Sequence, residues 1–166
     1  NVYQTMAYTD VLTGIANRAA CEEKIAEVGK KLESYSSIWC ICADINNLKH
    51  TNDTLGHAAG DQLIKGAAEI LKTVGFEDSV LYRTGGDEFV MLVFNQSEKD
   101  IREGKARFDQ ALTRYNSLHR TKLSIAWGCD RFRFESGDSI SKLLSRADAL
   151  MYEDKRRGKE AGVKKQ

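Results

Sequence analysis

The sequence contains no proline, so glycine, asparagine and aspartate must form the turns between its helices and strands. It also lacks long apolar runs: the longest, 38–43 and 89–94, have six residues each, whereas a membrane-spanning helix needs about 20. No charge of one sign dominates, because the formal net charge at pH 7 is +1. We therefore expect no direct membrane contact by this domain and no nucleic acid as its partner.

Cysteine is scarce and is not arranged for metal binding. The four cysteines include no Cys-x-x-Cys pair and have no histidine at zinc-finger spacing. Cys40 and Cys42 lie two residues apart in an apolar run, which places both on one face of a strand. This pattern is typical of buried free thiols in a reducing cytoplasm, and we expect a cytoplasmic domain.

The length and composition predict a single domain over residues 1–166. The chain has 42% hydrophobic and 30% charged residues, which suits one packed core under a solvated surface. It begins at Asn1 without an initiator methionine or a signal-peptide pattern, as a piece of a longer protein does. We therefore expect an upstream sensory or regulatory domain, and a parent protein anchored in a membrane is compatible with this expectation.

Hydrophobic periodicity predicts the order helix, strand, helix, helix, strand, strand, helix, strand, helix. The clearest segments are helices over 18–34, 63–74, 101–115 and 140–151 and strands over 38–45, 80–84, 88–94 and 122–129. The pair Gly85-Gly86 between two of these strands is typical of a β-hairpin. The sequence thus predicts an α/β or α+β domain whose central sheet is covered by helices and contains an antiparallel hairpin.

Carboxylates stand at the ends of two predicted strands. Asp44 closes one strand, while Asp87 and Glu88 lie at the hairpin tip. Converging carboxylates suit a hard divalent cation such as Mg²⁺. The alternative is that Asp44 caps the following helix and that Asp87 serves the turn only. No phosphate loop, dinucleotide-binding fingerprint or serine nucleophile elbow accompanies these acids.

Four ordered motifs carry a resemblance to a known family. Residues 83–89 read Arg-Thr-Gly-Gly-Asp-Glu-Phe, and residues 10–18 are similar to the opening D-x-L-T-x-L-x-N-R. Residues 44–61 are similar to D-x-D-x-F-K-x-x-N-D…G-H-x-x-G-D, and residues 146–159 are similar to a closing basic helix. Together these blocks resemble the GGDEF family of diguanylate cyclases over nearly the whole chain.

The resemblance implies an activity and a fold. Family members condense two GTP molecules into cyclic di-GMP and release two pyrophosphates, on a mainly antiparallel sheet related to nucleotidyl cyclases and polymerase palms. By this resemblance Asp44, the Ile45 carbonyl, Asp87 and Glu88 would hold Mg²⁺, with Mn²⁺ also suitable. Asp87 would assist deprotonation of the 3′-hydroxyl, and Glu88 would be a further catalytic carboxylate.

The resemblance also implies the residues that bind GTP. Asn52 and Asp61 match the guanine-reading positions, and an ionised aspartate accepts from the guanine N–H donors that adenine lacks. The triphosphate would lie on backbone N–H groups around Asn47 and Leu48, close to Gly86. The remaining phosphate ligands, both basic, would be Lys155 and Lys159.

Two consequences concern regulation and assembly. The family's product-inhibition motif, R-x-x-D, would fall at 76–79, where the sequence reads Phe-Glu-Asp-Ser, so feedback through that site should be absent. Each chain supplies one set of site residues although the product needs two phosphodiester bonds, which predicts a homodimer with two facing half-sites. The alternative function is a catalytically silent domain that binds GTP as a regulatory module.

Overall fold

The central sheet has five strands in the order β1-β3-β4-β2-β5. The computed structural model describes the backbone of residues 7–164 and the side chains of residues 7–158. The short β1 (Ala16–Asn17) runs parallel to β3 (Ser79–Arg83). The other neighbours, which are β4 (Glu88–Phe94), β2 (Ile38–Ile45) and β5 (Ile125–Arg131), pair antiparallel. The mainly antiparallel sheet and the predicted hairpin are therefore confirmed.

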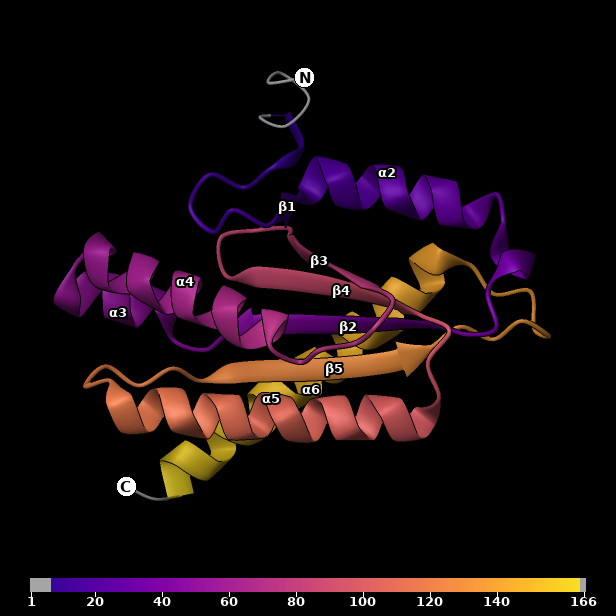
Figure 1. Ribbon diagram of the computed structural model, residues 1–166. Coiled ribbons are helices and arrows are strands. Elements are labelled where there is room, and N and C mark those ends of the chain that lie inside the picture. Colours follow the sequence, from indigo (N-terminus) through magenta and orange to yellow (C-terminus); the bar gives the residue numbers. More distant parts are fainter. Residues whose placement is uncertain (1–6, 165–166) are drawn as a thin grey trace.

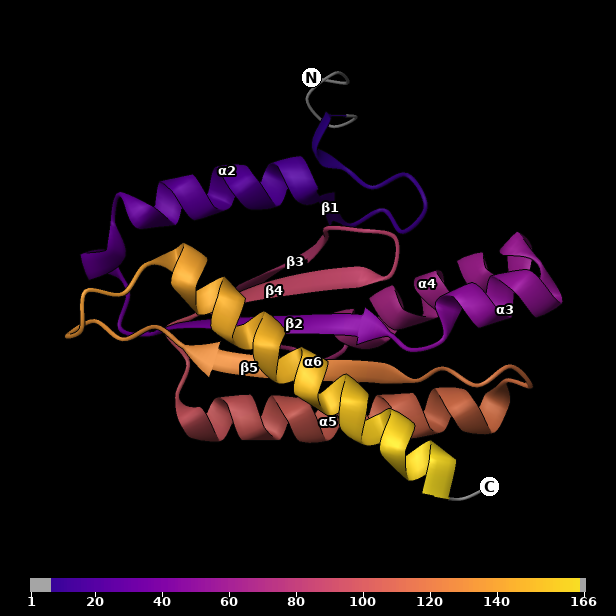
Figure 2. The ribbon, with the colours of Figure 1, turned by 180° about the vertical axis from the view of Figure 1, so that it is seen from behind.

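Helices cover both faces of this sheet (Figures 1 and 2). The face seen in Figure 2 carries α2 (Arg18–Gly29) and α6 (Ile140–Lys164), and α6 crosses the strands obliquely. The opposite face carries α4 (His57–Lys72) and α5 (Glu98–Leu118). The remaining helix, α3 (Leu48–Leu55), forms a pair with α4 beyond the end of β2 (Figure 1).

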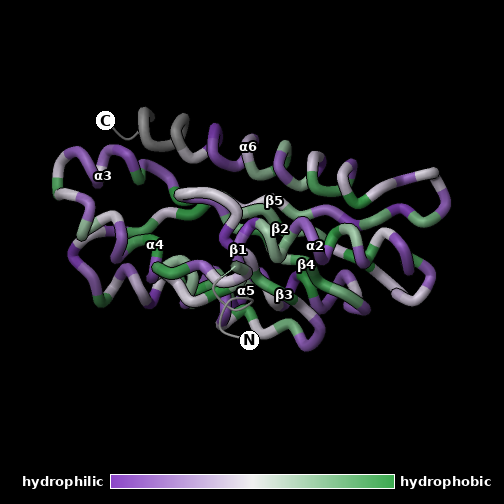
Figure 3. The backbone as a smooth tube through the Cα atoms, turned by 90° about the horizontal axis from the view of Figure 1, so that it is seen from above, coloured by the Kyte–Doolittle hydropathy of each residue, from purple (hydrophilic) through white to green (hydrophobic). Residues whose placement is uncertain are grey.

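The sequence of β2 explains why the sheet has helices on both sides. Every residue of this strand is buried, and successive side chains point to opposite faces. Ile38 and Cys40 join a cluster with α2 and α6, whereas Trp39 and Ile41 join a cluster with α4 and α5. Apolar residues accordingly follow the strands in the middle of the molecule, and hydrophilic residues dominate the peripheral α3 (Figure 3).

Several predicted boundaries differ from the structure. The helix expected over 18–34 ends at Gly29, and a 3₁₀ turn, η1 (Leu32–Ser34), follows it. Leu32 and Tyr35 still pack against the core, so the apolar spacing continues although the α-helix does not. The last strand begins at Ile125 rather than near Lys122, and β1 was not predicted because two residues give no periodicity.

The cysteines are free thiols, as expected. Cys21, Cys40 and Cys42 are buried, and Cys129 is half-buried. Burial raises the pKa of Cys21 to about 11 and that of Cys129 to about 12, which keeps both thiols protonated near neutral pH. Within residues 7–164, no helix is long and apolar enough to cross a membrane.

Candidate active site

The end of β2 brings together the two carboxylates that the sequence predicted. Asp44 pairs with Glu88 across the β2–β4 ladder, and the Ile45 N–H donates to the Asp87 carbonyl at 3.0 Å. This hydrogen bond fixes the hairpin tip against the end of β2. Asp44 is only 6% exposed, and burial raises the pKa of its carboxyl to about 6; the negative charge of Asp87 adds to this effect, and Lys155 opposes it.

Lys155 reaches this acidic end from α6. Its Nζ lies 2.8 Å from Asp44 Oδ1, and the two side chains are 22% and 9% exposed. The helix approaches the strand closely because Gly128 has no side chain: a Cβ there would lie 2.2 Å from the Met151 nitrogen. Asp154 Oδ2 also accepts from the Trp127 N–H of β5 at 2.9 Å. These contacts set the position of Lys155 over the strand end.

The chemistry of these donors fits a hard divalent cation. Asp44 and Asp87 supply carboxylate oxygens, and Ile45 contributes a backbone carbonyl at the same strand end. A buried carboxylate beside a second one needs a cation to stay ionised, and Mg²⁺ and Mn²⁺ prefer oxygen ligands. In the described part of the chain, no three His, Cys, Asp or Glu side chains converge as metal ligands. Glu88 is exposed and its carboxylate lies over Gly85, so its role as a metal ligand stays a prediction.

A cleft of about 500 Å³ adjoins Asp87 and Lys155. Its lining comes mainly from α3 and the residues just before it, and it consists of Ile45, Asn47, Leu48, Lys49, His50, Asp53, Asp87 and Lys155. Asn47 has a left-handed backbone, with φ of 61°, and its side chain makes no capping hydrogen bond to α3. The start of α3 thus lies beside the cleft without a capping side chain, and free N–H groups at a helix start suit an anion such as phosphate.

The predicted guanine-reading residues lie together on the α3–α4 pair. Gly56 separates the two helices, and its φ of 89° is readily adopted only by glycine. The Asn52 Oδ1 atom lies only 1.7 Å from where a Cβ of Gly60 would be, so Asn52 packs directly over the residue before Asp61. Both side chains are half-buried, but neither lines the 500 Å³ cleft. The structure thus brings Asn52 next to Asp61 but leaves both beside the cleft, not within it.

Nearly the whole described chain matches one family. The model of the family described as "Diguanylate cyclase, GGDEF domain" matches residues 7–161. The chain belongs to the GGDEF domain family.

Relatives and solved structures of the family agree with this assignment. The diguanylate cyclase DgcN of Escherichia coli is 33% identical over 157 residues, which cover 90% of this chain and 37% of that protein. The cyclic di-GMP phosphodiesterase PdeR of E. coli is 30% identical over 158 residues, which cover 93% of this chain and 23% of that protein. The GGDEF domain thus spans less than half the length of these curated relatives.

The fold is also that of a solved GGDEF structure. The coiled coil and GGDEF domain of DgcB from Caulobacter crescentus, solved with c-di-GMP, superposes with a TM-score of 0.80 at 26% identity. The match covers 95% of this chain and 85% of that chain. The mixed, mainly antiparallel sheet with helices on both faces is therefore the palm-like fold of GGDEF domains.

Some predicted residues of this GGDEF domain are not joined to the site, and some site residues were not predicted. Gly86 is exposed, and its carbonyl accepts from Arg83 Nη2 at 2.9 Å instead of lining the cleft. The side chain of Lys159 lies outside the described residues. Lys49, His50 and Asp53 line the cleft without having been predicted, although the place of Lys49 and His50 in the first turn of α3 was a usable signal.

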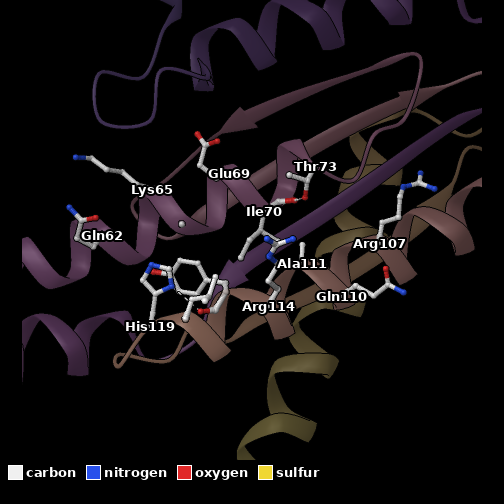
Figure 4. Close-up of a pocket in the computed structure, with 13 residues that line it drawn as sticks. Gln62, Lys65, Glu69, Ile70, Thr73, Arg107, Gln110, Ala111, Arg114 and His119 are labelled. Atoms are coloured by element: carbon white, nitrogen blue, oxygen red, sulfur yellow. Dashed lines mark hydrogen bonds between the residues drawn. The ribbon is translucent and has the colours of Figure 1, made fainter.

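A second hollow of the GGDEF domain lies elsewhere. A groove of about 740 Å³ runs between α4 and α5, and Figure 4 shows Arg114 reaching from α5 toward α4 across it. Tyr115 stacks on His119 at its end, with ring centroids 3.8 Å apart. None of the predicted site residues lines this groove.

Proposed function

We propose that this GGDEF domain is a diguanylate cyclase that condenses two GTP molecules into cyclic di-GMP. The observation that carries the proposal is the convergence of Asp44 and Asp87 at the strand end beside the uncapped start of α3. Two carboxylates for a metal ion lie next to backbone donors for a triphosphate, which is the arrangement that nucleotidyl transfer needs.

The chain's own residues would bind and orient the substrate. N–H groups around Asn47 and Leu48 would hold the triphosphate, and Lys155 and Lys159 would add positive charge. Asn52 and Asp61 would accept and donate hydrogen bonds at the guanine edge. A bound Mg²⁺ or Mn²⁺ on Asp44, Asp87 and the Ile45 carbonyl would neutralise charge on the leaving pyrophosphate.

The proposed step is attack of a ribose 3′-hydroxyl on the α-phosphorus of the second GTP. The new O3′–P bond forms as the bond from the α-phosphorus to the bridging oxygen breaks, and pyrophosphate leaves with that oxygen. The hydroxyl proton passes to the Asp87 carboxylate. A homodimer with two facing half-sites would make both phosphodiester bonds by the same step.

Product analysis tests this proposal. Concentrated protein incubated with GTP and Mg²⁺, and in parallel with ATP, should yield cyclic di-GMP and pyrophosphate from GTP only. Asp87→Asn should abolish turnover, whereas Asp109→Asn, which alters an exposed carboxylate on α5, should leave it intact.

If no product forms, a second measurement is needed, because a reaction between two half-sites slows when the separate domains seldom meet. A dimeric coiled coil fused ahead of Asn1 removes that limitation. Continued absence of product from the fused dimer, with GTP still bound, would favour the regulatory module over the cyclase.

A further inference from the structure

Lys155 is the cation that neutralises Asp44. Its ammonium lies 2.8 Å from Asp44 Oδ1, where both side chains are largely shielded from water. Among the described residues, no other lysine, arginine or histidine lies within ion-pair distance of Asp44. The charge that a metal ion on Asp44 would neutralise is therefore already neutralised by a residue of the protein.

The same ammonium also lines the cleft that adjoins the start of α3. Lys155 is thus placed between two anionic partners, the Asp44 carboxylate and a triphosphate on the α3 N–H groups. An ammonium and a divalent cation on one carboxylate repel each other at short range, and this repulsion is strong where water is excluded. Binding of a metal ion to Asp44 therefore competes with the Lys155 ion pair.

The contacts of α6 with β5 hold the helix backbone in place and leave the Lys155 ammonium free to move. Gly128 lets the helix backbone contact β5, and the Asp154 carboxylate accepts from the Trp127 N–H. Lys155 itself has a flexible four-carbon stem that ends in a rotating ammonium. Exchange between Asp44 and a phosphate then requires rotation of one side chain only.

We propose that Lys155 couples metal binding to nucleotide binding by exchanging its ammonium between Asp44 and the triphosphate. This inference rests on the proposed function and adds a linkage that the function does not require. The triphosphate draws the ammonium away and frees Asp44 for the metal ion. By reciprocity, a metal ion on Asp44 frees the ammonium for the triphosphate. The metal ion then raises the nucleotide affinity by the same factor by which the nucleotide raises the metal affinity.

Binding measurements on Lys155→Met test this coupling without turnover. Free Mn²⁺, followed by its electron paramagnetic resonance signal, should bind the variant about tenfold more tightly than the wild type when no nucleotide is present. The affinity for 3′-deoxy-GTP, which lacks the attacking hydroxyl, should be measured with EDTA and with excess Mg²⁺. The ratio of the affinity with Mg²⁺ to the affinity with EDTA should fall several-fold in Lys155→Met, because the ammonium that exchanges between Asp44 and the triphosphate is gone.

Lys49→Met is the matched control, since Lys49 lines the same cleft but forms no ion pair with Asp44. It removes one positive charge from the same cleft, so it measures the effect on binding of losing a nearby charge in general. Equal changes in Mn²⁺ affinity and in the nucleotide ratio in both variants would overturn the coupling role.

Asp44→Asn separates this inference from the proposed function. If Mn²⁺ binds the wild type and Asp44→Asn equally, with or without nucleotide, the proposed metal site is wrong and the coupling falls with it. If Asp44→Asn loses Mn²⁺ while Lys155→Met matches Lys49→Met, the metal site stands and only the coupling is wrong.

Discussion

The guanidinium of Arg83 donates to both carboxylate oxygens of Asp10, at 3.0 and 3.2 Å. The two side chains are 16% and 19% exposed, and Arg83 also donates to the Gly86 carbonyl at 2.9 Å. Asp10 in turn accepts from the Thr13 N–H and hydroxyl, at 3.0 and 2.6 Å. The Arg83 side chain therefore joins the turn at residues 10–13 to the hairpin that carries Asp87.

Arg83→Met should destabilise the domain and slow its reaction. The variant leaves a largely buried Asp10 carboxylate without its cation and releases the Gly86 carbonyl, at an expected cost of about 2–4 kcal/mol. The free energy of unfolding in urea measures the first effect, and the rate of cyclic di-GMP formation measures the second.

Arg18→Met provides the control for this prediction. Arg18 pairs with Glu22 at 3.3 Å on the surface of α2, where the side chains are 75% and 68% exposed. Exposed pairs contribute about 0–1 kcal/mol, so this variant should unfold almost as the wild type does. Similar losses in both variants would show that the Asp10–Arg83 pair has no special structural role.

Asp61→Ala should relax the choice between GTP and ATP. If Asp61 accepts from guanine N–H donors, kcat/KM for GTP should fall by about 100-fold or more, whereas that for ATP should change little. Competition between the two nucleotides measures the ratio directly. Glu69→Ala, an exposed carboxylate on the same helix, should leave the ratio unchanged, and an unchanged ratio in Asp61→Ala would remove Asp61 from the guanine site.

Cyclic di-GMP added at the start of a reaction should cause no noncompetitive inhibition. The position of the missing arginine is occupied by Phe76, which is 9% exposed. Its ring lies against Gly104, where a Cβ would come within 2.3 Å of the ring carbons, so this residue belongs to the core. Initial rates at several GTP concentrations provide the measurement, and a lower maximal rate with added product would contradict the prediction.

The strands and the acidic strand end could be predicted because their signals are local. The apolar runs at 38–43 and 89–94 mark strands that are buried on both faces, and β2 and β4 begin and end where the sequence indicated. Asp44 and Asp87 followed from their positions at the ends of these runs. The 3₁₀ turn η1 was not predictable, because Leu32 keeps the apolar spacing of the helix before it.

The contact of Lys155 with Asp44 could not be predicted from spacing. The two residues are 111 positions apart, and they meet only because α6 packs on the bare backbone of Gly128. Nothing in the local sequence around Gly128 or Lys155 indicates that close approach. The resemblance assigned Lys155 to phosphate, and the structure adds its carboxylate partner.

Acid should weaken the contact between α6 and the loop that precedes it. Arg146 of α6 donates to both oxygens of Asp138, at 2.7 and 2.8 Å, and to Asp130 at 2.7 Å. The Arg146 hydrogen bonds hold the pKa of Asp138 well below its ordinary value of 3.8; the N–H groups of Arg133 and Ser139 help, and burial opposes them. A carboxyl whose pKa is lowered in the folded state stabilises the fold fully at pH values above its ordinary pKa. This stabilisation is lost as the pH falls toward the lowered pKa.

Asp138→Asn should therefore lower the free energy of unfolding by about 2–4 kcal/mol at pH 7. The difference from the wild type should shrink as the pH falls below 3.8, because the wild-type carboxyl then takes up a proton on unfolding. Urea unfolding at a series of pH values measures both effects. Asp109→Asn, whose partner Lys105 is 38% exposed, should change stability by less than about 1 kcal/mol at every pH. A constant difference between Asp138→Asn and the wild type down to pH 3 would show that Asp138 stabilises the fold by its shape and hydrogen bonds alone, without its charge.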